Sequence, residues 1–182
     1  MTWPARPAGH VLLMDGAWIL LGMMGAGKST VGRALADALM LPFRDTDSIL
    51  QYKLGRPIQQ LFSLYGESTF RQHETAILQS LDREPGVLAT GGGIVLAEAN
   101  WTEFARLGTT IFLDIKPEKL IERLQQSKRK RPLLLAEAWE SKFMDIYETR
   151  YPIYRRADIH FPLDPTSLEE AVEALAKKVR SQ

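Results

Sequence analysis

The segment from Gly22 to Ser29 constrains this chain more than any other feature of its sequence. It reads GMMGAGKS and fits the pattern G-x-x-x-x-G-K-[ST] in full. It follows an apolar run at Ala17–Leu21, typical of a buried strand, and opens an amphipathic stretch at Lys28–Leu39, typical of a helix. Glycines let the backbone curl so that successive N–H groups point inward, and the start of the helix adds its positive end there. The segment is therefore predicted to bind phosphate groups.

The side chains of this segment predict how a nucleotide is held. Lys28 is placed to reach the β- and γ-phosphates, and the Ser29 hydroxyl is placed to ligate Mg²⁺. A chance glycine-rich turn is a poor alternative, because strand, motif and helix are in register. The motif alone does not say whether the phosphate acceptor is water, a protein or a small molecule. We expect ATP and Mg²⁺ as cofactors, with the nucleotide bound by Gly25, Ala26, Gly27, Lys28, Ser29 and Thr30.

Short apolar runs alternate with amphipathic helical stretches along the rest of the chain. This pattern predicts an α/β fold, with a central parallel five-stranded sheet and helices on both faces, as in the three-layer P-loop NTPase fold. The predicted strands are Ala17–Leu21, Pro42–Asp45, Val87–Thr90, Thr109–Asp114 and Ile159–Pro162. The predicted helices are Lys28–Leu39, Ser48–Leu54, Ile58–Tyr65, Thr69–Leu81, Ala97–Leu107, Pro117–Gln126, Ala138–Tyr147 and Leu168–Val179.

The bulk composition limits the kinds of protein that this chain can be. Its 182 residues fit one domain, which we expect over residues 17–182, after a loosely ordered N-terminal extension at 1–16. The apolar run Val11–Met14 is too short to span a membrane. A net charge of +1 gives no reason to expect nucleic acid or a membrane as partner. The absence of cysteine excludes disulfides and a cysteine nucleophile, and we expect a cytoplasmic location.

Two carboxylates follow the second predicted strand, at Asp45 and Asp47. Residues at i and i+2 of a strand end point the same way, here into the mouth of an open sheet near the phosphates. Asp45 can hold Mg²⁺ through its water shell, and Asp47 can accept a hydrogen bond from an acceptor hydroxyl. One of the two can instead cap the helix that follows, but a pair is more than a cap needs.

Further motifs follow the phosphate-binding segment in a definite order and spacing. Together they are Gly22–Ser29 with Thr30, Gly32 and Arg33, then Asp45-Thr46-Asp47, Gly66-Glu67, Phe70-Arg71, Glu74, Gly91-Gly92-Gly93, Arg131-Pro132-Leu133-Leu134 and Arg150-Tyr151-Pro152-Ile153-Tyr154. With these motifs, the chain resembles the shikimate kinase family from about Ala17 to Phe161. The phosphate-binding motif is shared with many NTPases, whereas the later motifs in this order and spacing are specific.

The resemblance implies an acceptor with a ring hydroxyl and a carboxylate. Arg71 and Arg150 each offer a planar fork to a carboxylate, although Glu74 can pair with Arg71 on the helix. The glycines Gly91, Gly92 and Gly93 allow close backbone approach to the acceptor, with Gly92 as the contact that the family implies. The third predicted strand ends without the Asp that many P-loop enzymes use for Mg²⁺, so the metal is assigned to Ser29 and Asp45.

The resemblance also implies a mobile lid at about residues 127–138 that excludes water. Within it, Arg131 matches an arginine that reaches both the transferred phosphate and the acceptor, and Arg123, before the lid, matches one that stacks on adenine. Lys28, Asp47 and Arg131 are the expected catalytic residues. The family suggests a monomer.

These features together predict ATP-dependent phosphorylation of the 3-hydroxyl of shikimate, giving shikimate 3-phosphate and ADP. Asp47 would orient the hydroxyl, while Lys28, Arg131 and Mg²⁺ would spread the developing charge. One alternative is a kinase of the same architecture for another small acceptor, such as gluconate or a nucleoside monophosphate. Another is a non-catalytic nucleotide-sensing protein that kept the fold.

Overall fold

The structure is a computed structural model and describes residues 15–127, 138–163 and 167–182. Nearly all of the expected N-terminal extension, and the lid with Arg131, lie outside these residues. None of the helices within the described ranges is long and apolar enough to cross a membrane.

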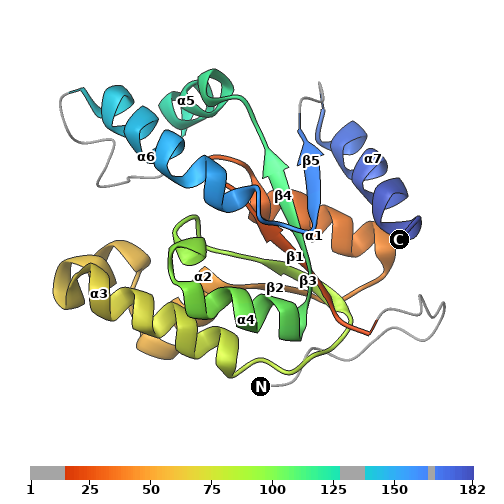
Figure 1. Cartoon of the computed structure of the whole chain (residues 1–182), viewed down its shortest axis with the longest axis horizontal. Coiled ribbons are helices and arrows are strands. Elements are labelled where there is room, and N and C mark those ends of the chain that lie inside the picture. Colours follow the sequence, from red (N-terminus) through yellow and green to blue (C-terminus); the bar gives the residue numbers. More distant parts are fainter. Residues whose placement is uncertain (1–14, 128–137, 164–166) are drawn as a thin grey trace.

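The centre of the fold is a parallel sheet, as the alternating apolar runs predicted (Figure 1). Its five strands lie in the order β2-β3-β1-β4-β5, so the strand before the phosphate-binding motif is in the middle. Since all pairs are parallel, the loops that follow β1, β2, β3 and β4 leave the same edge of the sheet. The strands are β1 Ala17–Leu21, β2 Phe43–Asp45, β3 Gly86–Ala89, β4 Gly108–Asp114 and β5 Ile159–Pro162.

Helices cover both faces of the sheet (Figure 1). Helices α1 and α7 pack against each other on one face, and α4 lies on the other with the C-terminal part of α6. Helices α2 and α3 pack together beyond β2. The bounds are α1 Lys28–Leu39, α2 Thr46–Leu54, α3 Ile58–Gln79, η1 Ile94–Leu96, α4 Glu98–Leu107, α5 Pro117–Gln126, α6 Trp139–Tyr154 and α7 Leu168–Arg180.

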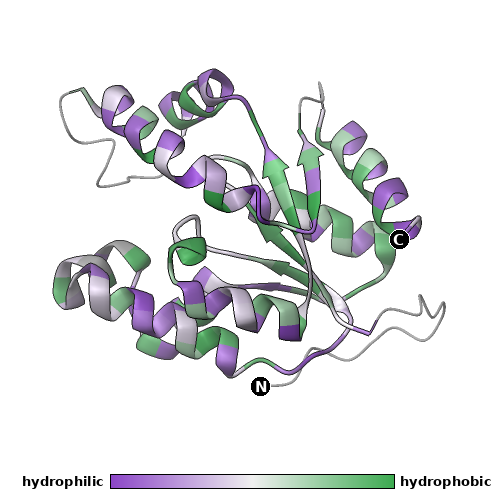
Figure 2. Cartoon of the chain, in the orientation of Figure 1, coloured by the Kyte–Doolittle hydropathy of each residue, from purple (hydrophilic) through white to green (hydrophobic). Residues whose placement is uncertain are grey.

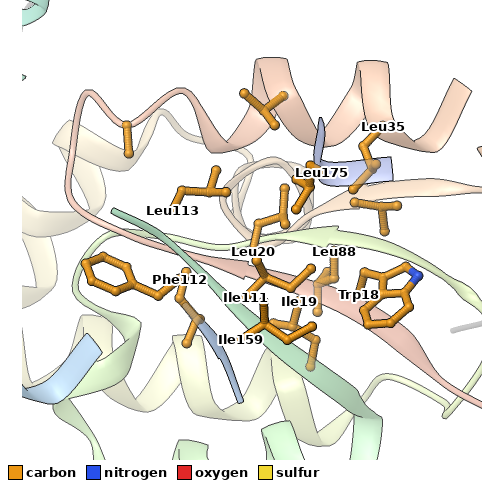
Figure 3. Packing of buried hydrophobic residues seen from close by; sticks show 14 of the residues in the cluster. Trp18, Ile19, Leu20, Leu35, Leu88, Ile111, Phe112, Leu113, Ile159 and Leu175 are labelled. Atoms are coloured by element: carbon orange, nitrogen blue, oxygen red, sulfur yellow. The ribbon is translucent and has the colours of Figure 1, made fainter. Parts of the chain in front are cut away.

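The hydrophobic core lies on both sides of the sheet. All five residues of β1 are buried, because they are covered on both faces as a central parallel strand requires. Leu35 of α1 and Leu175 of α7 pack on one side, and Phe112 and Ile159 lie on the other (Figure 3). Figure 2 shows the same division, with apolar strands inside and polar helix surfaces outside.

One helical break is confirmed, and one helix end differs from the structure. The helices expected at 58–65 and 69–81 are two helical segments of α3, which meet at a kink at Gly66, with φ 73° and ψ 170°. The helix expected to end at Tyr147 continues to Tyr154 with Pro152 inside it. Proline costs a helix one hydrogen bond and disfavours the preceding helical turn. The continuation is stabilised by packing, because the Tyr154 ring is fully buried and stacks on Phe112, with ring centroids 5.1 Å apart.

The close register of β1 and β4 leaves no room for a side chain at Gly108. Ala17 and Gly108 are paired, and a Cβ at Gly108 would overlap backbone atoms of Ala17, including its carbonyl carbon at 2.8 Å. We expect Gly108→Ala to lower the free energy of unfolding by about 1–3 kcal/mol, measured by urea denaturation. An unchanged urea midpoint in Gly108→Ala would contradict this pairing of β1 with β4.

Candidate functional site

The phosphate-binding loop connects the central strand to the first helix, as its motif predicted. Gly25 and Gly27 have φ values of 87° and 81°, a region in which other residues are strained. Gly27 is also the residue before the first turn of α1, and its carbonyl accepts from Val31 N at 2.8 Å. The loop therefore wraps around the N-terminus of a helix, where free N–H groups and the helix dipole favour an anion.

Lys28 is buried within this loop. Its Nζ donates to the carbonyl oxygens of Gly22 at 2.6 Å and Met23 at 3.0 Å, and its exposed fraction is only 8%. These contacts hold the ammonium group against the loop that is to receive the phosphates. A cation at this position favours the binding of a polyphosphate.

Ser29 and Asp45 meet at the start of α1 and the end of β2. The Ser29 hydroxyl lies 2.5 Å from Asp45 Oδ2, while Asp45 Oδ1 accepts from the backbone N–H groups of Asp47 and Ser48. Asp45 is thus the N-cap of α2, which answers the question of which aspartate caps the helix. The remaining carboxylate, Asp47, lies in the first turn of α2. The expectation that Asp45 and Asp47 point the same way from a strand end is therefore wrong, because α2 begins at Thr46, directly after the strand.

The pair Ser29 and Asp45 fits Mg²⁺ by the chemistry of its donors. Magnesium prefers oxygen ligands and takes one or two from a protein, with phosphate oxygens and waters completing the shell. A hydroxyl and a carboxylate oxygen lie side by side next to the phosphate-binding loop, which suits this arrangement. Among residues 15–127, 138–163 and 167–182, no cluster of three His, Cys, Asp or Glu side chains could hold a metal by itself.

The triple glycine after β3 brings the acceptor-side residues together. A Cβ at Gly91 would lie 2.8 Å from an oxygen of Asp47 and equally close to an oxygen of Glu74. A Cβ at Gly93 would overlap the guanidinium of Arg71. Both carboxylates and the guanidinium therefore lie directly against this short stretch of backbone. Only glycine leaves room for them.

The middle glycine joins this group to the phosphate-binding loop and to α6. A Cβ at Gly92 would lie 3.2 Å from the backbone nitrogen of Met24. The Gly92 carbonyl accepts from Arg150 Nη1 at 3.4 Å and from the Tyr154 hydroxyl. Arg150, Arg71 and Asp47, which are far apart in the sequence, thus meet around one tripeptide beside the phosphate-binding loop.

Glu74 is a buried carboxyl of this group with a raised pKa. Arg71 Nη1 lies 2.6 Å from Glu74 Oε2, and Arg71 Nη2 lies 3.1 Å from Glu67, so the expected pairing of Arg71 with Glu74 is confirmed. Glu74 is 3% exposed, and this burial raises the pKa of its carboxyl to about 7. The charge of Arg71 opposes the rise in this pKa, and the charge of Asp47 adds to it. Glu74 therefore exchanges its proton near neutral pH.

The other predicted residues lie at the edges of this site. Gly25 packs against Leu124 and Leu120 of α5, so α5 borders the phosphate-binding loop. Arg123 is exposed on the last turn of α5, and Thr30 is exposed on the first turn of α1. Arg131 lies outside the described residues. The roles of these three residues remain predictions.

Sequence reasoning missed two side chains that shape the site. Tyr154 was part of a motif but had no assigned role, and only its contact with Gly92 reveals one. Thr46 was also part of a motif without an assigned role, and its hydroxyl accepts from Gly91 N at 3.1 Å. Thr46 lies between Asp45, predicted to bind Mg²⁺, and Asp47, predicted to bind the acceptor hydroxyl. This position was only a weak indication of the contact with Gly91.

The raised pKa of Glu74 predicts a pH-dependent stability. Because the folded pKa is above the ordinary value of 4.5, the stabilisation is complete below pH 4.5 and is lost as the pH rises to about 7. From pH 5 to pH 8, the free energy of unfolding should therefore fall by about 2–3 kcal/mol more in the native chain than in Glu74→Gln.

Urea denaturation at the two pH values measures this difference, and Glu67→Gln is the matched control. Glu67 is the exposed partner of the same arginine, so its substitution should leave the pH dependence in place. Parallel pH profiles for the native chain and Glu74→Gln would contradict the assignment.

Comparisons with known proteins identify the family of the chain. A family model described as shikimate kinase matches residues 24–180. A shikimate kinase from Synechococcus sp. (strain JA-3-3Ab) is 38% identical over 169 residues, covering 90% of this chain and 89% of that protein. A structure of a shikimate kinase from Acinetobacter baumannii in complex with shikimate is 33% identical, with a TM-score of 0.84 over 91% of this chain and 93% of that one.

A more distant structure shares the fold alone. A gluconokinase from Sinorhizobium meliloti 1021 is 21% identical, with a TM-score of 0.55 over 93% of this chain and 98% of that one. The family model and the closer relatives, by contrast, cover most of the chain at well above this identity. The chain therefore belongs to the shikimate kinase family.

Proposed function

We propose that this chain transfers the γ-phosphoryl group of ATP to the 3-hydroxyl of shikimate, giving shikimate 3-phosphate and ADP in the pathway to chorismate and the aromatic amino acids. The observation that carries the proposal is the convergence of Asp47, Arg71 and Arg150 on Gly91–Gly93, next to the phosphate-binding loop. One carboxylate and two guanidinium groups form a pattern complementary to a small acceptor with a hydroxyl and a carboxylate. The Acinetobacter baumannii relative, solved with shikimate, supports the same acceptor.

The donor half of the reaction uses the loop and the first turn of α1. The backbone N–H groups of Gly25 and Gly27 bind phosphate oxygens, and Lys28 neutralises charge on the β- and γ-phosphates. Ala26 N donates to Met23 O at 3.1 Å, which holds the loop around the phosphates. Ser29 and Asp45 are the residues that would hold Mg²⁺, which supplies further neutralisation of the phosphate charge when bound. The helix dipole of α1 points its positive end at the same phosphates.

The acceptor half uses the tripeptide and the side chains around it. Arg71 and Arg150 bind the carboxylate of shikimate, and their separate origins on α3 and α6 fix its direction. The backbone of Gly91, Gly92 and Gly93 approaches the ring closely. Asp47 orients the 3-hydroxyl and accepts its proton as the new O–P bond forms in line with the bond that breaks.

The proposal extends to parts of the chain outside this pocket. Arg131 stabilises charge on the transferred phosphoryl group from a lid at about 127–138 that excludes water, and Arg123 stacks on the adenine. Residues 17–182 act as a single catalytic domain after an extension at 1–16. The enzyme works as a monomer in the cytoplasm.

Gluconate is the nearest competing acceptor, because a sugar acid also carries a carboxylate and hydroxyl groups. The gluconokinase comparison reaches the level of the fold only, so it does not favour gluconate for this chain. Supplied with ATP and Mg²⁺, the purified chain should release ADP with shikimate and not with gluconate or AMP, in a coupled assay. Activity on gluconate without activity on shikimate would overturn the proposal.

Removal of the proposed proton acceptor should abolish most of the turnover. We expect Asp47→Asn to lower kcat by about 10²–10⁴-fold, as is typical for the loss of a general base. The far-ultraviolet circular dichroism spectrum should be unchanged. Asp37→Asn, the same change at an exposed position of α1, is the matched control and should keep native turnover. Native kcat in Asp47→Asn would remove this role from Asp47.

A further inference from the structure

The carbonyl group of Gly92 is the common acceptor of two side chains from one helix. Arg150 Nη1 lies 3.4 Å from this oxygen, and the Tyr154 hydroxyl donates to it as well. The two residues are four positions apart on α6, so they lie on the same side of the helix. Arg150, which is proposed to bind substrate, and the buried Tyr154 thus donate to the same carbonyl oxygen.

Tyr154 is held firmly in place by its surroundings. Its side chain is fully buried, and its ring stacks on Phe112 of β4 with an interplanar angle of 11°. Burial raises the pKa of the Tyr154 hydroxyl above its ordinary value, so the hydroxyl keeps its proton and acts as a donor. Because the Tyr154 ring is fixed against β4, its hydroxyl fixes the position of the Gly92 carbonyl relative to the central sheet.

The orientation of this carbonyl also fixes the next residue. The Gly92 carbonyl and the Gly93 N–H belong to one planar peptide unit, so a hydrogen bond to one end sets the plane of both. The Cα of Gly93 lies against the guanidinium of Arg71. The peptide unit between Gly92 and Gly93 is therefore in contact with Arg150 at one end and with Arg71 at the other.

A stretch of three glycines has no side chains of its own to hold this peptide plane. Glycine samples more backbone conformations than any other residue, so the order of this segment has to come from contacts with its neighbours. Gly92 packs on the backbone of Met24 on one side. The Tyr154 hydroxyl bonds the carbonyl oxygen directly and constrains its direction.

We propose that Tyr154 is a positioning residue, which sets the spacing of Arg71 and Arg150 through the Gly92–Gly93 peptide and so determines the affinity of the site for the substrate carboxylate. The inference rests on the proposed function, since it assigns those two arginines to that carboxylate. Tyr154 itself does not touch the substrate. The competing explanation is that the tyrosine only fills the core, in which case its hydroxyl is dispensable for binding.

Tyr154→Phe separates these explanations, because it removes the hydroxyl and keeps the ring on Phe112. We expect the KM and the Kd for shikimate to rise about 10-fold, as for the loss of one buried hydrogen bond, with kcat at saturation and the KM for ATP close to native. Tyr151→Phe is the matched control. Its hydroxyl donates to Asp114 and its ring also contacts Phe112, with centroids 5.8 Å apart, so it should keep native values.

The methyl ester of shikimate tests whether the effect passes through the carboxylate. This ester carries no negative charge for the two arginines, so the native chain and Tyr154→Phe should bind it with equal Kd. A penalty of the same size for shikimate and its ester would show a general structural role and would overturn the proposal. Native shikimate affinity in Tyr154→Phe would overturn it too.

Two further measurements distinguish a failed positioning role from an unstable variant and from a failed proposed function. If Tyr154→Phe is too unstable to assay, Tyr154→4-aminophenylalanine keeps the ring and a donor at the same place and should bind shikimate with near-native Kd, whereas a 10-fold higher Kd would overturn the proposal. If the native chain itself does not phosphorylate shikimate, the proposed function fails. A native chain that is active beside a Tyr154→Phe variant with native KM refutes the positioning role alone.

Discussion

The close approach of Gly92 to the phosphate-binding loop is the contact on which the rest of the site depends. The loops after β1 and β3 leave neighbouring strands at the same edge of the sheet, and a Cβ at Gly92 would come within 3.2 Å of Met24 N. The phosphate-binding loop and the triple glycine therefore lie against each other without an intervening side chain. Phosphoryl transfer relies mainly on positioning, so this spacing matters more than any single reactive group.

Burial of charge is the second constraint on the site. Arg71, Glu74, Asp47 and Arg150 are gathered around one tripeptide, where desolvation makes an unpaired charge costly. The carboxyl of Glu74 holds a proton near neutral pH, which lowers the free-energy cost of burying a charge there. Its contact with Arg71 holds the guanidinium in place. The same pair leaves the guanidinium of Arg71 directly against Gly93.

Much of the fold follows from local sequence patterns. The phosphate-binding loop was predicted correctly because glycine geometry, a buried strand and a helix start are short-range features. The parallel sheet was predicted from its apolar runs, with ends off by one residue, as at β3, which starts at Gly86. Helix α6 was predicted too short, because the local preference of Pro152 is overridden by the packing of Tyr154 on Phe112, 42 positions away. The raised pKa of Glu74 arises from burial by distant elements, which no local pattern reveals.

The central claim is that Asp47, Arg71 and Arg150 form one acceptor pocket beside the nucleotide phosphates. The most direct measurement is a crystal structure of the chain with shikimate and ADP. The account predicts the shikimate carboxylate within hydrogen-bonding distance of both arginines, and a ring hydroxyl on Asp47 that faces the β-phosphate. Shikimate bound elsewhere, or bound without either arginine, would contradict the account.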